Sequence, residues 1–307
     1  MGFHLASRYT AAAPTHPGPA KERAVTEGIW LTIAAALAWS AFDACRKTLV
    51  GVTRPAPLAA VLAWAQAPVF AVWALLESDP HLSSGYLAPG LKVAAMNTVA
   101  CLGFFTALRH GDLSRTVPLL SLSPVFTALL SAVVLNEQLS NNQWLGVLSV
   151  VGGALLLARP EPGATQTGWR GPAWMTLTAL LWAGTTVYDK VSLGYASLAV
   201  HAGVQTLGLA VVLTVWLGAR ARIDEMLTVR ARPRWFAVGV LVSTLALGLQ
   251  LQAVSLLPVG IMESLKRATG MVAALVIGRL TFNEALDARK WLSVAAMSAG
   301  VWLVVGG

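Results

Sequence analysis

Apolar runs of about 17 to 22 residues recur along this chain, separated by short loops that hold most of its charges. Only 12% of the 307 residues are charged and 56% are hydrophobic, which gives a mean hydropathy of +0.65. A globular domain carries about 25% charged residues, so this composition cannot cover a water-exposed surface. A helix crosses the bilayer with roughly 20 apolar residues, and ten such runs account for most of the chain. The sequence therefore predicts an all-α integral membrane protein with ten transmembrane helices.

Charges, glycines and prolines mark the ends of the ten predicted spans. The spans are expected at residues 28–46, 56–76, 89–108, 114–135, 142–158, 171–189, 197–218, 235–254, 259–280 and 288–305. The stretch RPEPGATQTGWR at 159–170 divides them five and five, and we interpret it as a linker. The predicted organisation is a disordered polar tail at 1–27, a first five-helix unit at 28–158 and a second five-helix unit at 171–305.

The two five-helix units resemble each other. The same residue recurs 147 positions later at eight places in the first unit: Asn136, Glu137, Leu139, Trp144, Leu145, Val147, Gly153 and Leu156. A shift of 143 positions also matches four residues of the first span with the sixth: Gly28, Leu37, Trp39 and Lys47 with Gly171, Leu180, Trp182 and Lys190. Because each unit has an odd number of spans, the second enters the membrane from the opposite side, and we expect two inverted repeats. Alternating-access transporters use this design and bind substrate at mid-bilayer between the repeats.

The first unit also carries a recognisable set of motifs. It contains ALRHGDLSRTVPLLSLSPVFTALLSAVVLNEQLS at 107–140, QWLG at 143–146 and two glycines at 152–153. These motifs resemble the EamA repeat of the drug/metabolite transporter superfamily, and the second unit resembles it more weakly, since Leu265 and Met271 replace Pro118 and Pro124. The resemblance implies a ten-helix bundle that moves small metabolites across the plasma membrane, here the bacterial inner membrane. It leaves open whether the cargo is an amino acid, a sugar, a nucleotide conjugate or a drug.

Three charged residues of the ninth predicted span share one helical face. Glu263, Lys266 and Arg267 are three and four residues apart. A charge at membrane depth costs roughly 2.5 to 3.5 kcal/mol on insertion scales, so such residues are functional candidates. We interpret Lys266 or Arg267 as attracting an anionic or zwitterionic head group of the substrate, and Glu263 or Asp43 as taking up a coupling proton. A self-compensated pair at the helix entrance is the alternative interpretation.

Two further groups repeat the pattern at span ends. Asp43 precedes Arg46 and Lys47 at the same spacings, and Asp189 precedes Lys190. For both groups an interfacial salt bridge with snorkelling cations is the alternative to a coupling site.

Prolines and tryptophans complete the predicted substrate site. Pro118 and Pro124 interrupt the fourth span, and carbonyls freed at membrane depth need a partner from protein or a hydrated cavity. Trp39 and Trp182 form a repeat-related pair that either stacks on the substrate or packs between helices. Other polar residues either line the same cavity or form hydrogen bonds across helices, and the second is expected of each: Gln66, Asn97, Gln205, Gln250 and Gln252. For His201, the histidine within a predicted span, local hydrogen bonding is expected and a proton relay is the alternative. The repeated acids Glu137 and Glu284 are expected to cap helices.

Several chemistries are excluded by what the sequence lacks. There is no GxxxxGK[ST] loop, so transport is expected to be driven by gradients. The five histidines are scattered and the two cysteines are far apart, so we expect no metal site, no cofactor and no catalytic set. The sequence predicts a secondary-active transporter, in particular an exporter of amino acids or related compounds with proton coupling or exchange. An integral membrane enzyme or an anion-selective channel that uses the same charges is the alternative.

The expected partners follow from this interpretation. They are a small-molecule substrate and the lipid bilayer, with no nucleic acid, and the protein is expected as a monomer or homodimer. Fifteen of the 22 Lys and Arg residues lie in or next to odd-numbered loops, so the positive-inside rule places both termini outside, whereas the family resemblance implies cytoplasmic termini.

The inverted repeat makes a prediction about sidedness. Cysteines introduced at Asn136 and Asn283, the repeat-related positions, should react with a membrane-impermeant thiol reagent from opposite sides of the membrane. Labelling of both from the same side would contradict the inverted arrangement.

Overall fold

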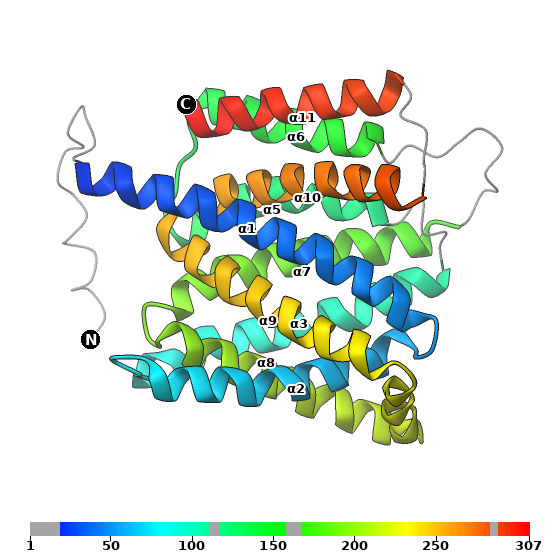
Figure 1. The fold of residues 1–307 in the computed structure, drawn as a ribbon. Helices are drawn as coiled ribbons and strands as arrows, with labels where there is room; N and C mark the ends of the chain where they lie inside the picture. The colour runs from blue at the N-terminus through cyan, green and yellow to red at the C-terminus, as the bar shows by residue number, and fades with distance from the viewer. Residues whose placement is uncertain (1–18, 111–116, 158–167, 283–287) are drawn as a thin grey trace.

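The computed structural model describes residues 19–110, 117–157, 168–282 and 288–307, and this part of the chain is helical throughout apart from short loops. The long helices are α1 (Pro19–Val50), α2 (Pro55–Leu76), α3 (Leu87–His110), α5 (Ser123–Val134), α6 (Asn141–Leu157), α7 (Arg170–Ser192), α8 (Leu198–Gly218), α9 (Pro233–Leu256), α10 (Val259–Phe282) and α11 (Ala288–Gly306). Short 3-10 helices are η2 (Ser84–Tyr86), η3 (Val117–Leu122) and η4 (Ile223–Ala231). Figure 1 shows the long helices lying side by side in one elongated bundle.

Each predicted span falls on one of these helices, and the fourth is divided between η3 and α5. By length and composition, five segments qualify as candidate spans: most of α1, α2, η2 with α3, α8 and α9. The other helices are shorter or more charged. For example, α6 has 17 residues, and α10 contains Glu263, Lys266 and Arg267. The protein is therefore an all-helical chain with several apolar helices able to cross a membrane.

The N-terminal boundary differs from the sequence prediction. Helix α1 begins at Pro19, so residues 19–27 are helical rather than part of a disordered tail. Proline is favoured at the first helical position because its φ angle suits the helix, and the following AKER segment consists of good helix formers. Polarity alone led to the assignment of these residues to the tail. Residues 1–18 of that predicted tail lie outside the described part of the chain.

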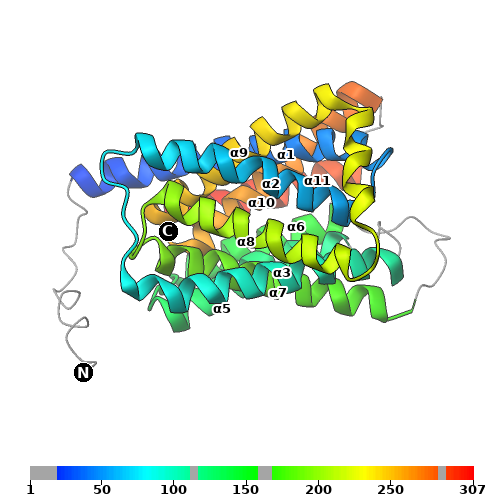
Figure 2. The same ribbon diagram turned by 90° about the horizontal axis from the view of Figure 1, so that it is seen from below.

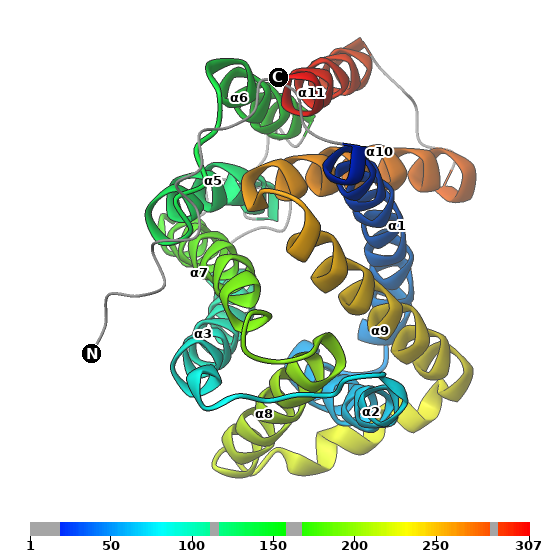
Figure 3. The same ribbon diagram turned by 90° about the vertical axis from the view of Figure 1, so that its left-hand side faces the viewer.

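The helices pair mainly across the two five-helix units. The most extensive contacts are those of α1 with α9, α2 with α8, α3 with α7, and α6 with α11. Figure 3, which looks along the bundle, shows α6 and α11 side by side, next to α5 and α10. The two units are thus interleaved, and neither forms a separate five-helix body.

The pair of α6 and α11 obeys the internal repeat. Gly146 lies against the Gly300 carbonyl, and Gly153 lies against the Ser293 carbonyl. Gly146 is equivalent to Ser293 in the repeat, and Gly153 is equivalent to Gly300. The two contacts are therefore equivalent to each other, and a local pseudo-twofold axis relates the two helices. Ser149 Oγ donates a hydrogen bond of 2.8 Å to the carbonyl of Ala296, its own repeat equivalent. Small residues allow this close approach of the two backbones, as is common between helices in membranes.

One end of the bundle is called the termini face here. It contains the start of α1, the end of α11 and the loops at 77–86, 135–140, 193–197 and 257–258. Figure 2 shows the α2–α3 and α7–α8 connections at this end. The opposite face contains the loop at 51–54 and helix η4.

The close contact between α6 and α11 yields a stability prediction. In Gly146→Ala a methyl group would lie 2.6 Å from the Gly300 carbonyl oxygen and from Val304, so the helices must move apart. We expect a loss of about 1–3 kcal/mol, the usual cost of overpacking, measured by reversible unfolding in detergent micelles.

Gly152→Ala on the same helix is the matched control, since no atom lies within 4 Å of its added methyl group. This variant should be unchanged or more stable by up to about 1 kcal/mol. Equal losses in the two variants would contradict the packing described for α6 and α11.

Candidate functional site

The charged face of α10 meets α9 and α1 inside the bundle. The Glu263 side chain is only 4% exposed and forms an ion pair with Lys266 on the next turn. Lys266 Nζ also donates to Gln250 Oε1 of α9 at 3.1 Å. The same Gln250 oxygen accepts a 2.9 Å hydrogen bond from Trp39 Nε1 of α1. Three predicted site residues, Trp39, Glu263 and Lys266, are therefore brought together, and Gln250 is the residue that joins them.

Arg267 satisfies a carbonyl that Pro124 leaves without its helical partner. In an α-helix the Leu120 carbonyl would accept from the N–H of residue 124, but proline has no N–H. The Arg267 Nη2 donates to this carbonyl at 3.0 Å and to Ser123 Oγ at 3.1 Å. The shift of 147 positions places Leu120 on Arg267, so the broken helix and the charged helix meet at equivalent positions. The predicted interruption by Pro118 and Pro124 takes the form of η3 followed by a new helix, α5.

A second charged pair lies on α1. Arg46 Nη2 is 2.9 Å from Asp43 Oδ1, and the Asp43 side chain is 60% exposed. Asp43 stands about 10 Å before the end of α1, given a rise of 1.5 Å per residue. A charged group does not face hydrocarbon at low cost, so the exposed side of this pair indicates a hydrated space. Asp43 and Arg46 thus form a salt bridge, and Asp43 is also within electrostatic range of Arg267.

Aromatic rings connect the two predicted tryptophans. The Arg46 guanidinium lies 5.9 Å from the ring centre of Phe42 and 5.8 Å from that of Phe104 on α3. Phe42 packs edge-on against Trp39, and Phe104 packs against Trp182 of α7, with centroids 5.8 and 5.6 Å apart. Trp182 Nε1 donates to Asn97 Oδ1 at 3.2 Å. Trp39 and Trp182 are therefore half-buried and each packs against a phenylalanine, and the Arg46 guanidinium lies near both phenylalanines.

The whole group is called the central cluster and carries a net positive charge. It contains the cations Arg46, Lys266 and Arg267 and the anions Asp43 and Glu263, which leaves one surplus positive charge. Arg267 interacts electrostatically with both carboxylates. Phe104 could not be found from the sequence, because an apolar aromatic residue in an apolar helix gives no distinguishing signal.

Glu137 joins the two units beside the central cluster on the termini face. Its carboxylate accepts from Lys190 Nζ at 2.7 Å and from the N–H of Val259, the first residue of α10, at 2.8 Å. Lys190 Nζ also donates to the Leu257 carbonyl at 2.6 Å. Glu137 thus caps a helix of the other unit and not the helix that follows its own turn, because Ser140 and Gln143 cap α6 with reciprocal hydrogen bonds. Glu284 lies outside the described residues.

Most of the other polar residues also bond across helices, as expected. Gln66 Nε2 donates to Ser243 Oγ at 2.7 Å, and Gln205 Nε2 donates to Tyr86 Oη at 3.1 Å. Gln252 differs, because its side chain is exposed on α9.

On the opposite face the units are joined through η4, outside the spans. Glu225 pairs with Arg222 at 2.8 Å and with Arg54 at 2.9 Å. Hydrogen bonds from Arg222 hold the pKa of Glu225 below its usual value, and the charge of Arg54 adds to the effect.

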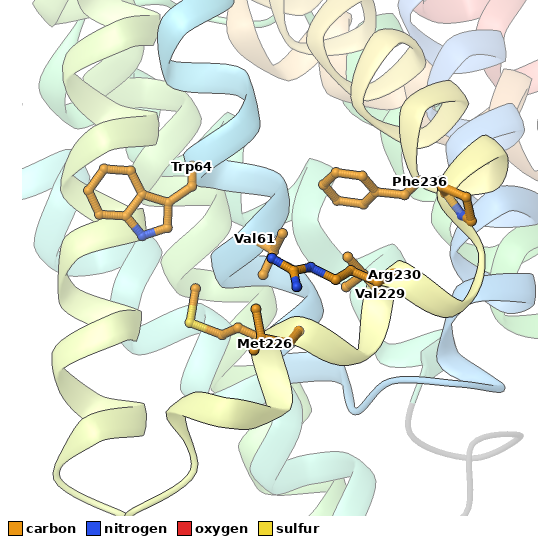
Figure 4. Close-up of a pocket in the computed structure, with 8 residues that line it drawn as sticks. Val61, Trp64, Met226, Val229, Arg230 and Phe236 are labelled. Carbon is orange, nitrogen blue, oxygen red and sulfur yellow. The ribbon is translucent and has the colours of Figure 1, made fainter.

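A hollow of about 400 Å³ lies beside this helix, between α2, η4 and α9. Figure 4 shows Trp64, Phe236, Met226 and Arg230 around it. None of the predicted site residues lines this hollow.

Comparison with known proteins identifies the family. The model of the EamA-like transporter family matches residues 26–159 and again 169–306. The chain belongs to the EamA-like transporter family. These EamA matches cover nearly the whole chain as two copies, and together with the several apolar helices they indicate a multi-pass membrane protein.

Two similar proteins were found in addition. A Sinorhizobium protein named "Uncharacterized transporter in cobO 3'region" is 46% identical over 57 residues, which span 19% of this EamA chain and 40% of that relative. A crystal structure titled "Crystal structure of protein" has the same fold, with a TM-score of 0.75, 17% identity and coverage of 91% of this chain and 96% of the other.

The contact of Arg267 with Leu120 predicts a specific coupling. Arg267→Met leaves the Leu120 carbonyl without its donor, so it should destabilise the protein by about 1–3 kcal/mol. Pro124→Ala restores an N–H four residues after Leu120, and in that background the same change should cost less. A double-mutant cycle in reversible unfolding should give a coupling of about 0.5–3 kcal/mol, and strictly additive losses would contradict the exchange of donors.

Proposed function

We propose that this protein is a gradient-driven secondary transporter of small metabolites that works by alternating access across the plasma membrane. The substrate site is the central cluster, between η3–α5 on one side and α10 on the other. The observation that carries the proposal is the charged face of α10, held inside an otherwise apolar bundle next to an interrupted helix. Broken helices and intramembrane charges are typical of transporter binding sites.

All ten long helical segments span the membrane in this proposal, as two inverted repeats. Support comes from the helix pairs that join the two units, because the contacts run in opposite directions along the two paired helices. Gly28 lies against Leu257 and Gly239 against Leu49 in the pair of α1 and α9. The helices that are too short or too charged to be candidate spans by themselves are shielded from lipid by the helices that pack against them.

The surplus positive charge supports a substrate with an anionic or zwitterionic head group, such as an amino acid. Lys266 is the proposed contact, because its amino group is shared between Glu263 and Gln250 and can be redirected. Arg267 contributes its charge, while one of its nitrogens holds the η3–α5 break. Trp39 and Trp182 provide the apolar wall. Glu263 or Asp43 takes up the coupling proton, and export is the proposed direction.

The interleaved packing shapes the proposed motion. Rocking of one repeat against the other would separate the four most extensive helix pairs at once. We place the motion instead between two mixed groups, one with α1, α2, α8 and α9 and one with α3, α5, α7 and α10. The contacts of Glu137 with Lys190 and Val259 close the termini face of the central cluster, and they must break when substrate passes on that side.

The proposal is tested by flux. A thermal-shift screen with amino acids and related carboxylates on detergent-purified protein identifies a ligand, since binding to the native state raises its apparent stability. Counterflow of that ligand in proteoliposomes should then fall at least roughly tenfold in Lys266→Gln and in Glu263→Gln, in line with the roughly 1.5–3 kcal/mol of a charged hydrogen bond.

Arg234→Gln is the control, because Arg234 is exposed at the start of α9, away from the central cluster. It should retain wild-type flux, and an imposed pH gradient should change the wild-type rate. Wild-type flux in folded Lys266→Gln and Glu263→Gln proteins would contradict the site. A non-saturating conductance would indicate the channel, and turnover of a covalent product would indicate an enzyme.

A further inference from the structure

A second buried polar group lies outside the central cluster, at the termini face. The imidazole of His201 on α8 is only 1% exposed. Its Nε2 is 3.0 Å from Asp189 Oδ1 on α7, and its Nδ1 is 2.8 Å from Tyr86 Oη at the end of η2. The carboxylate is 8% exposed. His201 is thus bonded on both sides, without contact to the proposed substrate residues.

The hydrogen bonds assign the protons of this group. Gln205 Nε2 donates to Tyr86 Oη at 3.1 Å and to the Gly90 carbonyl at 3.1 Å. The hydrogen of Tyr86 Oη has His201 Nδ1 as an acceptor 2.8 Å away, and donation to Nδ1 is the arrangement in which both this hydrogen and the ring hydrogen have acceptors. The imidazole is then neutral, with its hydrogen on Nε2 and donated to the Asp189 carboxylate. A second proton on Nδ1 would displace the phenolic hydrogen and leave it without an acceptor.

The three residues come from both five-helix units. Tyr86 belongs to the first unit, and Asp189 and His201 belong to the second. Around them the units are joined by further contacts of the α2–α3 loop: Ser83 donates to the Tyr195 carbonyl, Leu82 pairs with Ala196, and Glu77 bonds to Ser197 and to the N–H of Ala199. If the termini face opened by breaking these contacts of the α2–α3 loop, Tyr86 would move away from His201.

The neighbouring charged groups are already engaged. Lys190 is held by Glu137 and the Leu257 carbonyl, and Lys92 of α3 lies over the Tyr188 ring at 4.6 Å. Glu77 at the end of α2 is bonded to the start of α8, and His81 and Asp79 are exposed in the same loop. The side chains that α2 and α9 contribute here are apolar: Phe70, Leu247 and Leu251 pack around Ala202. Within the described chain, His201 is the one titratable side chain hydrogen-bonded to the Asp189 carboxylate.

We propose that Tyr86, His201 and Asp189 form a proton-binding latch on the termini face. While this face is closed, Tyr86 occupies Nδ1 and His201 holds one ring proton. When the face opens, Nδ1 is released to water and binds a proton, which gives an imidazolium paired with Asp189. Because the open state binds the additional proton, acidification favours the open termini face and alkaline conditions favour the closed one. The inference rests on the proposed alternating access and adds a site distinct from the central cluster.

The first test examines the proton positions without any substrate. Nitrogen NMR of histidine-labelled protein in nanodiscs distinguishes the two neutral tautomers and the imidazolium, and His201→Gln identifies the signal among the five histidines. At pH 8 we expect a neutral ring with its hydrogen on Nε2. A hydrogen on Nδ1 in the neutral ring, or an imidazolium, at that pH would overturn the proposal.

The second test measures opening of the face. Ala196 is 1% exposed, so a cysteine there, in a background with Cys45 and Cys101 replaced by alanine, should react slowly with a polar thiol reagent. A cysteine at exposed Ser78 corrects for the pH dependence of the reagent. From pH 8 to 5.5 the corrected rate should rise by up to about tenfold per pH unit for one linked proton. The rise should vanish in His201→Gln, and it should move to lower pH in Asp189→Asn because the imidazolium loses its carboxylate partner.

Tyr86→Phe keeps the ring but removes the donor to Nδ1. Its labelling profile should shift to higher pH because the closed face loses the hydrogen bond that competes with protonation of Nδ1, and this variant decides the matter if His201→Gln fails to fold. The same pH slope in His201→Gln as in the wild type, or an unshifted profile in Tyr86→Phe, would overturn the latch. Neither test depends on substrate flux, so absence of transport would contradict the proposed function and leave the latch to be judged by these results.

Discussion

Within the hydrocarbon region no water is available, so each charge and each free backbone group must find its partner inside the protein. The contact of Arg267 with the Leu120 carbonyl meets this requirement from both sides. Pro124 removes a backbone donor from the η3–α5 segment, and Arg267 of the charged helix α10 supplies one. The interruption of one helix and the charge on the other are therefore mutually dependent, and together they hold a polar region in the middle of an apolar bundle.

The same requirement explains how the helices are arranged. Polar groups are placed where helices of different units meet: Trp39 with Gln250, Trp182 with Asn97, and Glu137 with Lys190 and α10. Where no polar group joins the helices, glycines allow direct backbone contact, as between α6 and α11. A duplicated chain folded in this way buries many of its polar groups between the copies.

Much of the fold could be predicted from the sequence. Apolar length and punctuation located the ten long helices, because the cost of exposing a polar backbone to lipid leaves helices as the solution for such runs. The internal repeat and the family motifs were also readable, as the two EamA matches show. The start of α1 was not, because a polar segment of good helix formers resembles a polar tail in composition. The hydrogen bonds of Gln66, Asn97 and Gln205 were expected in kind, but their partners on distant helices were not.

The sequence by itself determined that the chain is a duplicated, all-helical membrane protein with charges on the ninth predicted span, because hydrophobicity and spacing are properties of local stretches. Only the tertiary structure decided which groups meet. Glu137 caps a helix of the other unit, Trp39 reaches Lys266 through Gln250, and His201 lies between an aspartate of α7 and a tyrosine of the first unit. Each of these contacts joins residues on different helices, and the lateral packing of helices depends on side-chain shape across the whole bundle rather than on any one segment.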